Sequence, residues 1–147
     1  MPLPDGLKAI AGAQELHDWF GYWPTFHDAE IVSLILNRTS PSVLTIHTWE
    51  ITHEVDKAGY YVLAKDVVVE FILDISAADD SLELRGFSHQ NVMMSLAIEK
   101  IDSTCQLTLE QCYGLAGTIK ANNISIHLTP GGPGDMQEDG PSVNSRE

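Results

Sequence analysis

The apolar and polar residues of this chain alternate with a period of two over most of its length. In residues 67–75 every odd position is apolar, whereas the charged residues Glu70 and Asp74 occupy even positions. Residues two positions apart lie on the same face of a strand, so this pattern predicts a β-strand with one buried face. Comparable alternation predicts further strands at 31–37, 82–85, 94–99, 105–110 and 124–128.

The first of these strands has charged residues just before it. In 31–37 the alternation predicts that Val32, Leu34 and Leu36 face the core. Asp28 and Glu30 share the parity of these residues, so they are expected at the end of the inward face. A carboxylate placed there would need a polar partner.

The segment 43–54 gives a mixed signal. Leu44 and Ile46 predict one inward face, whereas Trp49 and Ile51 predict the other. A slip of one residue exchanges the two faces of a strand, so a β-bulge is expected near His47 or Thr48. A sheet with both faces partly covered would give the same pattern.

A helix is predicted only near the N-terminus. Leu16, Trp19 and Phe20 form one apolar stripe within residues 12–20, and Gly21 is a suitable helix end. The links between the predicted strands are short and rich in turn-forming residues, which favours antiparallel pairing of successive strands. We therefore expect a mainly β fold (α+β at most), as an antiparallel, meander-rich sheet or sandwich with one short N-terminal helix.

The end of the chain differs in composition. Residues 130–147 read PGGPGDMQEDGPSVNSRE, with Met136 and Val143 as the sizeable apolar residues. Such a segment buries too little apolar surface to offset the entropy lost on ordering. We expect one β-rich domain over 1–129 and a flexible acidic tail over 130–147.

The charge of the chain limits its partners. It has 147 residues and a formal net charge of −13, with 21 acidic against 8 basic residues. Nucleic acids and anionic membranes are recognised through Lys and Arg, so neither is an expected partner. The charge suits a basic protein partner, or serves solubility alone. The first residues lack the pattern of a secretory signal and no apolar run is long enough for a bilayer, so a cytoplasmic location is expected.

Neither cysteine forms a recognisable motif. Cys105 and Cys112 fall near one predicted strand, where seven residues extend about 23 Å, too far for a disulfide without a turn. Both are predicted to be free thiols, with Cys105 buried. The familiar nucleotide, nucleophile and metal motifs are missing, so no catalytic residue, cofactor or metal is expected.

An aromatic cluster precedes the first strand. Trp19, Phe20, Tyr22, Trp23 and Phe26 are followed directly by His27-Asp28-Ala29-Glu30. One interpretation is that the rings line a pocket in which His27, Asp28 and Glu30 act as acid–base groups or metal ligands. The alternative is that the rings dock the helix on the sheet and the cluster serves the fold.

Acidic residues recur in loops and at strand ends. They offer a negative face for a cationic partner, or an ordinary solvated surface. The candidate contact residues are Glu50, Glu54, Asp56, Asp79, Asp80 and Glu83.

The run WFGYWPTFHDAEI at 19–31 resembles the N-terminal signature of the Imm50 family of bacterial immunity proteins. A second, weaker block covers LELRGF at 82–87 and QNV at 90–92. The resemblance implies a mostly β protein that is not an enzyme and that binds and blocks a cognate toxin of a polymorphic toxin system. It also implies that the matched positions mark the fold more than a contact surface. These positions are Trp19, Trp23, Pro24, His27, Asp28 and Glu30.

The function that we expect is therefore neutralisation of a toxin domain, for which a basic, nuclease-like toxin is the best fit to the charge. The alternative is a small-molecule or metal-binding β-domain that uses the cluster at 19–30. A third hypothesis is a structural domain that self-associates. The sequence leaves the oligomeric state open.

Overall fold

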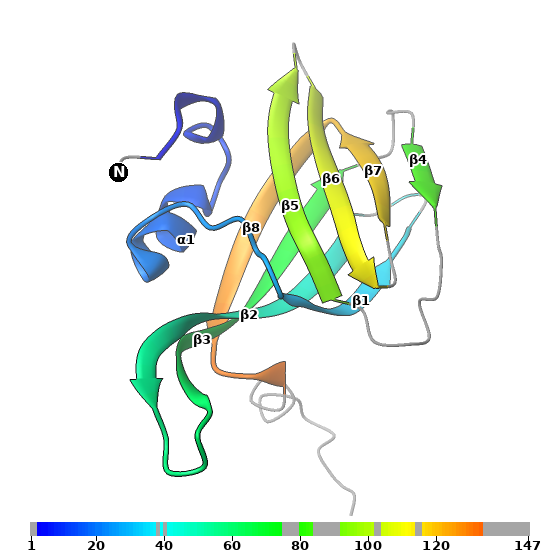
Figure 1. Cartoon of the computed structure of the whole chain (residues 1–147). Coiled ribbons are helices and arrows are strands. Elements are labelled where there is room, and N and C mark those ends of the chain that lie inside the picture. Colours follow the sequence, from blue (N-terminus) through cyan, green and yellow to red (C-terminus); the bar gives the residue numbers. More distant parts are fainter. Residues whose placement is uncertain are drawn as a thin grey trace, which may run out of the picture.

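The computed structural model describes residues 3–37, 39, 41–74, 80–83, 92–101, 104–113 and 116–133. Within these ranges, it describes only the backbone of residues 51, 53, 80–83, 94 and 111–113. The described residues form a 3₁₀ turn, one α-helix and eight strands (Figure 1). In chain order these are η1 Asp5–Leu7, α1 Ala13–Phe20, β1 Glu30–Ile35, β2 Ser42–Val55, β3 Tyr61–Asp74, β4 Asp80–Glu83, β5 Val92–Ile101, β6 Thr104–Tyr113, β7 Ala116–Ala121 and β8 Asn123–Pro130.

All eight strands belong to one antiparallel sheet, with the order β4-β7-β6-β5-β1-β2-β3-β8. Two meanders, β1-β2-β3 and β5-β6-β7, lie side by side within it. Among the described residues a single pair, Glu30 with Val92, joins β1 to β5 at the junction of the meanders. The expectation of a mainly β, antiparallel fold with one short N-terminal helix is confirmed, in the form of one curled sheet.

The curl of the sheet creates an inner face, and the N-terminal segment packs along its open side. The η1 turn contacts β5 and α1 contacts β8, while β6 and β8 also approach each other (Figure 1). Side chains from both helical elements and from seven strands form one apolar core. Its largest fully buried members include Phe26, Phe71, Leu16, Leu44, Ile46, Leu107 and Ile124. Burying side chains of this size contributes about 1.5–3 kcal/mol each, so this core is the main source of stability.

The helix forms as its pattern predicts. Leu16 and Phe20 are 0% and 3% exposed, and Gly21 ends α1 with a φ of 86°. Gly12 begins it with a φ of 88°, where a Cβ atom would lie 1.9 Å from the carbonyl oxygen of Ile126. The approach is this close because the amide of Ile126 donates a 2.8 Å hydrogen bond to the carbonyl of Ala11. Only glycine fits this position.

The expected inward face of the first strand is wrong at Val32 and Leu36, whereas Leu34 packs against the core as expected. The pairing of β1 with β2 shifts between Ile31 and Ser33, so Val32 is an extra residue and the strand changes face there. Ile31 is therefore buried, whereas Val32 is 41% exposed. Leu36 is 51% exposed because it follows the last residue of β1. The expectation for Asp28 and Glu30 fails as well, since their side chains are 46% and 56% exposed.

The bulge expected within 43–54 near His47 or Thr48 is not on that strand, although a register shift lies beside this position. The pairing of β2 with β3 shifts between Thr48 and Glu50, and the extra residue lies on β3, where Lys65 adopts a φ of 57°. Leu44 and Ile46 are fully buried, as the alternation predicts.

Other expectations concern strands and the tail. Cys105 is a buried free thiol, as predicted, whereas only the backbone of Cys112 is described. Strand β7 was not predicted, and β3 begins six residues before the alternation does. Most of the expected tail, 134–147, lies outside the described residues, so the division at 129 stays a prediction.

Candidate functional site

The aromatic run at 19–26 connects the helix to the core of the sheet. The ring of Trp23 meets that of Phe26 edge-on, with centroids 6.1 Å apart, and Phe26 meets Phe71 of β3 in the same way at 5.7 Å. Phe26 is 2% exposed although its φ is 65°, a conformation that costs a residue of this size roughly 1–2 kcal/mol. The buried ring contacts compensate for this strain.

The residues after Phe26 strengthen the junction of the two meanders. The amide of Asp28 donates to the carbonyl of Met93 at 2.9 Å, and the amide of Met93 donates to the carbonyl of Ala29 at 3.0 Å. The amide of Leu96 donates in turn to the carbonyl of Thr25 at 3.1 Å. The backbone of 25–29 thus continues the pairing that β1 and β5 make through one residue pair.

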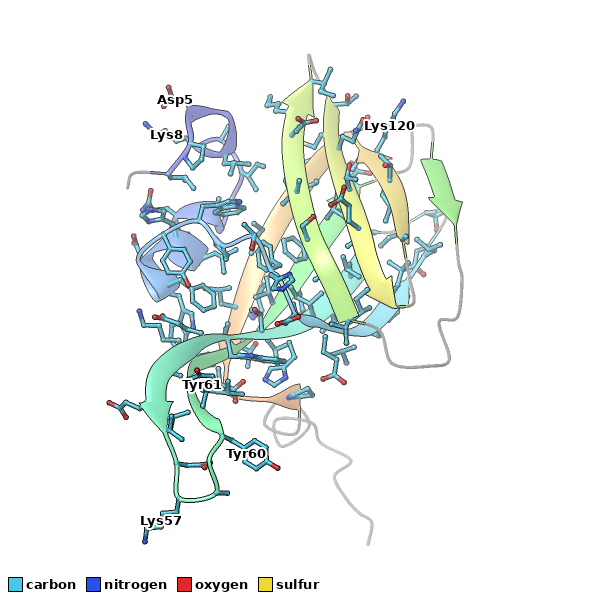
Figure 2. The ribbon with its side chains drawn as sticks, viewed as in Figure 1. Asp5, Lys8, Lys57, Tyr60, Tyr61 and Lys120 are labelled. Atoms are coloured by element: carbon cyan, nitrogen blue, oxygen red, sulfur yellow. The ribbon has the colours of Figure 1, made fainter. Side chains whose placement is uncertain are left out.

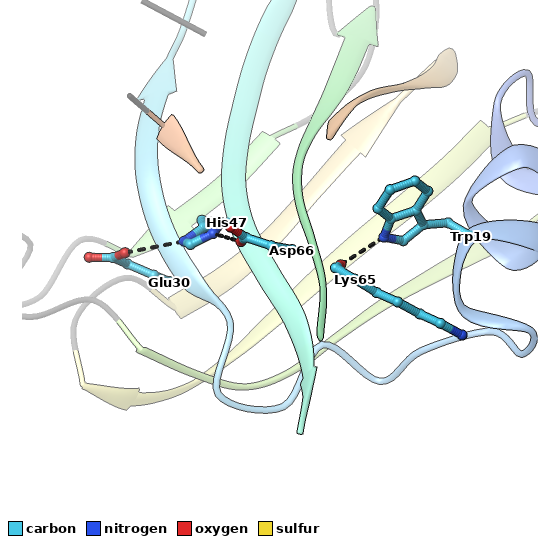
Figure 3. A network of polar contacts seen from close by, with 5 residues as sticks. All are labelled: Trp19, Glu30, His47, Lys65 and Asp66. Carbon is cyan, nitrogen blue, oxygen red and sulfur yellow. Dashed lines mark hydrogen bonds and ion pairs between the residues drawn. The ribbon is translucent and has the colours of Figure 1, made fainter. Parts of the chain in front are cut away.

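Trp19 fastens the helix to the bulge in β3. Its indole N–H donates a 2.7 Å hydrogen bond to the carbonyl of Lys65 (Figure 3). The Nζ atom of Lys65 donates to the carbonyl of Phe20 at 3.2 Å and lies 3.3 Å from a carboxylate oxygen of Glu50. We call these contacts of Trp19, Phe20, Glu50 and Lys65 the latch.

The side chains of His27, Asp28 and Glu30 do not converge on one point. His27 Nε2 lies 3.5 Å from Asp28 Oδ1, and both residues line an open hollow of about 300 Å³ that also involves Tyr22 and Trp49. Glu30 lies elsewhere, with its Oε1 atom 3.9 Å from Nδ1 of His47. In the described ranges, no three His, Cys, Asp or Glu side chains are grouped so that they could hold a metal ion.

Tyr22 borders this hollow. Burial raises the pKa of Tyr22 above its ordinary value, and the negative charge of Glu50 adds to the rise, which Lys65 opposes in part. A tyrosine with a raised pKa keeps its proton at neutral pH and is a hydrogen-bond donor rather than a base. The hollow therefore offers polar binding groups rather than an evident reaction centre.

A second polar cluster centres on His47 of β2. Its Nε2 atom hydrogen-bonds to Oδ1 of Asp66, while Glu30 faces the other ring nitrogen (Figure 3). The ring also contacts Trp49, with centroids 5.0 Å apart. The chain returns to this place after β8, where the amide of Gly131 donates to the carbonyl of Asp66 at 2.8 Å. Sequence reasoning did not link these residues, because they come together only through the register of three strands.

Strands β2 and β3 run on past the rest of the sheet as a hairpin, which we call the arm and define as residues 49–66 (Figure 1). Several of its apolar side chains are turned to solvent. Val55, Tyr60, Tyr61 and Leu63 are 56%, 73%, 62% and 52% exposed, and we call these four residues the apolar patch. The sequence shows two adjacent tyrosines beside a turn, but their exposure depends on where the neighbouring strands stop.

The six acidic contact candidates do not share one element. Glu50, Glu54 and Asp56 belong to the arm, where Glu50 pairs with Lys65 and Glu54 is exposed. Asp80 and Glu83 lie in β4, which the sheet order separates from β2 by four strands, and only their backbone is described. Asp79 lies outside the described residues.

Within the part of the chain that the structure describes, no helix is long and apolar enough to cross a bilayer. No curated protein sequence and no solved structure is significantly similar to this chain. A model of the family described as immunity protein 50 matches residues 12–130, which include α1, every strand and the motif at 19–31. The chain therefore belongs to the Imm50 family of immunity proteins.

Proposed function

We propose that this protein binds a cognate bacterial toxin domain in the cytoplasm and neutralises it by covering its surface, without catalysing a reaction. The match to the immunity protein 50 family over residues 12–130 carries this proposal. The net charge of −13 supports it further, because an acidic protein associates fast with a basic partner.

The charge also favours one class of toxin. A nuclease-like toxin needs Lys and Arg in its active-site cleft to hold phosphates. Carboxylates pair with the same side chains through charge-assisted hydrogen bonds, so an acidic protein is suited to block such a cleft. The candidate carboxylates are Glu50, Glu54, Asp56, Asp79, Asp80 and Glu83.

We assign the family signature a role in folding. Trp19 takes part in the latch, Trp23 packs on Phe26, and Pro24 is buried. The amide of Asp28 bonds to β5, and Glu30 pairs with Val92 at the junction of the meanders. On this account, replacing the side chains of His27 and Asp28 leaves toxin binding intact.

The proposal is tested by coexpression with the toxin encoded beside this chain's gene. We expect growth to be restored and a stoichiometric complex to elute from a sizing column. Unrelieved killing together with the absence of a complex would reject the proposal.

A second candidate function rests on the hollow of about 300 Å³ beside His27 and Asp28. It suits a small polar ligand held by a binding protein, whereas a metal ion would need ligands beyond His27 and Asp28, because no three ligating side chains are grouped in the described residues. Metal analysis of the purified protein and a thermal-shift screen of small ligands distinguish this candidate from the first. A bound metal or a ligand-dependent rise in Tm that is lost in His27→Ala would favour it.

A further inference from the structure

The arm is a two-stranded ribbon that extends beyond its neighbours. Strands β2 and β3 have 14 residues each, whereas β1 has six and β8 has eight. The pairing of β1 with β2 ends at His47, and that of β8 with β3 ends at Val67. In the described part of the chain, no third strand pairs with residues 49–66. Isolated two-stranded ribbons are marginally stable in water, so other contacts must hold the arm.

Polar contacts hold the arm at both ends. At its tip, Oδ1 of Asp56 accepts hydrogen bonds from the amides of Ala58 and Tyr60 at 2.9 and 3.0 Å. The amide of Asp56 donates to the carbonyl of Tyr60 at 2.8 Å, which closes the turn. At its base, the latch joins Lys65 to α1. A ribbon ordered in this way loses less conformational entropy when it binds a partner.

The apolar patch lies mainly on one face of this ribbon. Val55 is opposite Tyr61 across the two strands, and Leu63 is two residues from Tyr61 on the same side. Tyr60 projects near the tip, and Lys57 extends from the turn in another direction (Figure 2). Exposed apolar groups on an ordered element mark interaction surfaces, and tyrosine is enriched among the residues that dominate binding energy.

Acidic residues adjoin the patch. The arm carries four carboxylates and two lysines. Glu50 is paired with Lys65 and Asp66 with His47 at its base, so Glu54 and Asp56 are the carboxylates nearest the patch in the chain. Glu54 is exposed and adjacent to Val55 in the chain. An apolar centre with an acidic rim is complementary to a protein surface with an apolar recess bordered by Lys and Arg. Docking of a second copy of this chain would instead bring together two molecules that each carry a net charge of −13 and repel one another.

We infer that the arm is the element that docks on the toxin, with the apolar patch filling a recess and Glu54 pairing with a cation at its border. This inference rests on the proposed function and adds to it the contact surface and the chemistry of the toxin's recess. Val32 and Ile35 of β1 and the following Leu36 are similarly exposed but include no tyrosine and no carboxylate, so they serve as the control surface.

The first experiment measures the affinity of purified full-length protein for the purified toxin domain encoded beside its gene. The test variant is Tyr60→Ser with Tyr61→Ser, and the control is Ile35→Ser with Leu36→Ser, whose residues are 54% and 51% exposed. We expect the Kd to rise about thirty-fold or more for the test variant, the effect of losing hot-spot residues, and less than about threefold for the control. Both variants should keep the wild-type Tm within a few degrees, because neither pair lies in the core.

The second experiment tests the charge on the arm. Glu54→Lys should slow association with the toxin domain about fivefold or more at low salt, with a smaller effect at high salt. Glu99→Lys, an exposed carboxylate on β5, makes the same change in net charge and should slow association less. Equal slowing by the two variants would show that net charge acts without a contribution from the arm.

A photo-crosslinking residue at position 60 locates the contact directly. We expect it to attach the toxin domain, whereas the same residue at position 35 should not. If wild-type protein binds the toxin but the arm variants bind equally well and position 60 gives no crosslink, the inference is wrong and the proposed function stands.

Crosslinks between copies of the chain, with a dimer that the arm variants dissociate, would also overturn the inference in favour of a second copy. Absence of binding by the wild-type protein would instead count against the proposed function, and the inference would fall with it.

Discussion

At the scale of single residues, Gly12 has no room for a side chain. Gly12→Ala would place a Cβ atom 1.9 Å from the carbonyl oxygen of Ile126, in a conformation with positive φ. The carbonyl belongs to β8 and cannot move without disturbing its hydrogen bonds. We expect a loss of about 2–4 kcal/mol in the free energy of unfolding, measured by urea denaturation.

Gly21→Ala measures the energetic cost of a positive φ alone, without a steric clash. Gly21 has a φ of 86°, but nothing lies within 4 Å of the place that a Cβ atom would occupy there. Its replacement should cost about 1–2 kcal/mol, the penalty of the left-handed conformation alone. Equal losses at the two glycines would contradict the close approach of Ala11–Gly12 to β8.

Tyr22 should make the free energy of unfolding depend on pH in the alkaline range. Its pKa is raised in the folded state by burial, so above the unfolded value of about 10 the unfolded chain loses a proton that the folded chain keeps. By linkage the free energy of unfolding falls as the pH rises through this range. Tyr22→Phe should make the loss of stability above about pH 10 shallower, as followed by urea denaturation, without changing its slope near neutral pH. An unchanged alkaline slope would argue against the raised pKa of Tyr22.

At the scale of elements, the latch connects the helix to the arm. Trp19→Phe removes the indole N–H that bonds to the carbonyl of Lys65. We expect a loss of about 1–2 kcal/mol, with faster amide hydrogen exchange concentrated in residues 49–66. Trp23→Phe is the matched control, because Trp23 packs on Phe26 and lines a surface hollow with residues of β5 rather than of the arm. Exchange in the arm that responds equally to both substitutions would contradict the latch.

Alternation in the sequence was sufficient to predict most strands and their buried faces. It succeeded at the inward positions of 67–73 and 105–110, which face one core continuously, although Val68 is buried as well. It failed at Val32, where an inserted residue reverses the face, since a bulge depends on the partner strand. It also missed β7, Ala116–Ala121, where Gly117 interrupts the pattern and Ile119 is the one large apolar residue.

The candidate site was less predictable than the fold. The sequence drew attention to residues 19–30, and one of its two interpretations brought His27, Asp28 and Glu30 together, whereas the structure pairs His27 with Asp28 and places Glu30 beside His47. The arm was not foreseen, because a strand pattern does not reveal where the neighbouring strands end. The apolar patch is exposed because β2 and β3 are longer than β1 and β8 and because their register leaves residues 49–66 beyond the ends of these neighbours.

At the scale of the whole molecule, membership of an immunity protein family and the acidic net charge both fit a protein that binds a basic partner. A curled sheet of eight strands, closed along one side by the N-terminal segment, supports an arm that projects from one end (Figure 1). The fold supplies a rigid base, and the net charge of −13 supplies long-range attraction toward a basic partner. Association with the toxin should therefore slow as salt screens the charges, while dissociation changes less.

The most direct test of neutralisation by binding is a titration of the toxin domain's own activity with this protein in a purified system. We predict that activity falls in proportion to the protein added and ends at one equivalent, with the titrant recovered unchanged in the complex. Full activity in the presence of a molar excess of the folded protein would contradict the account.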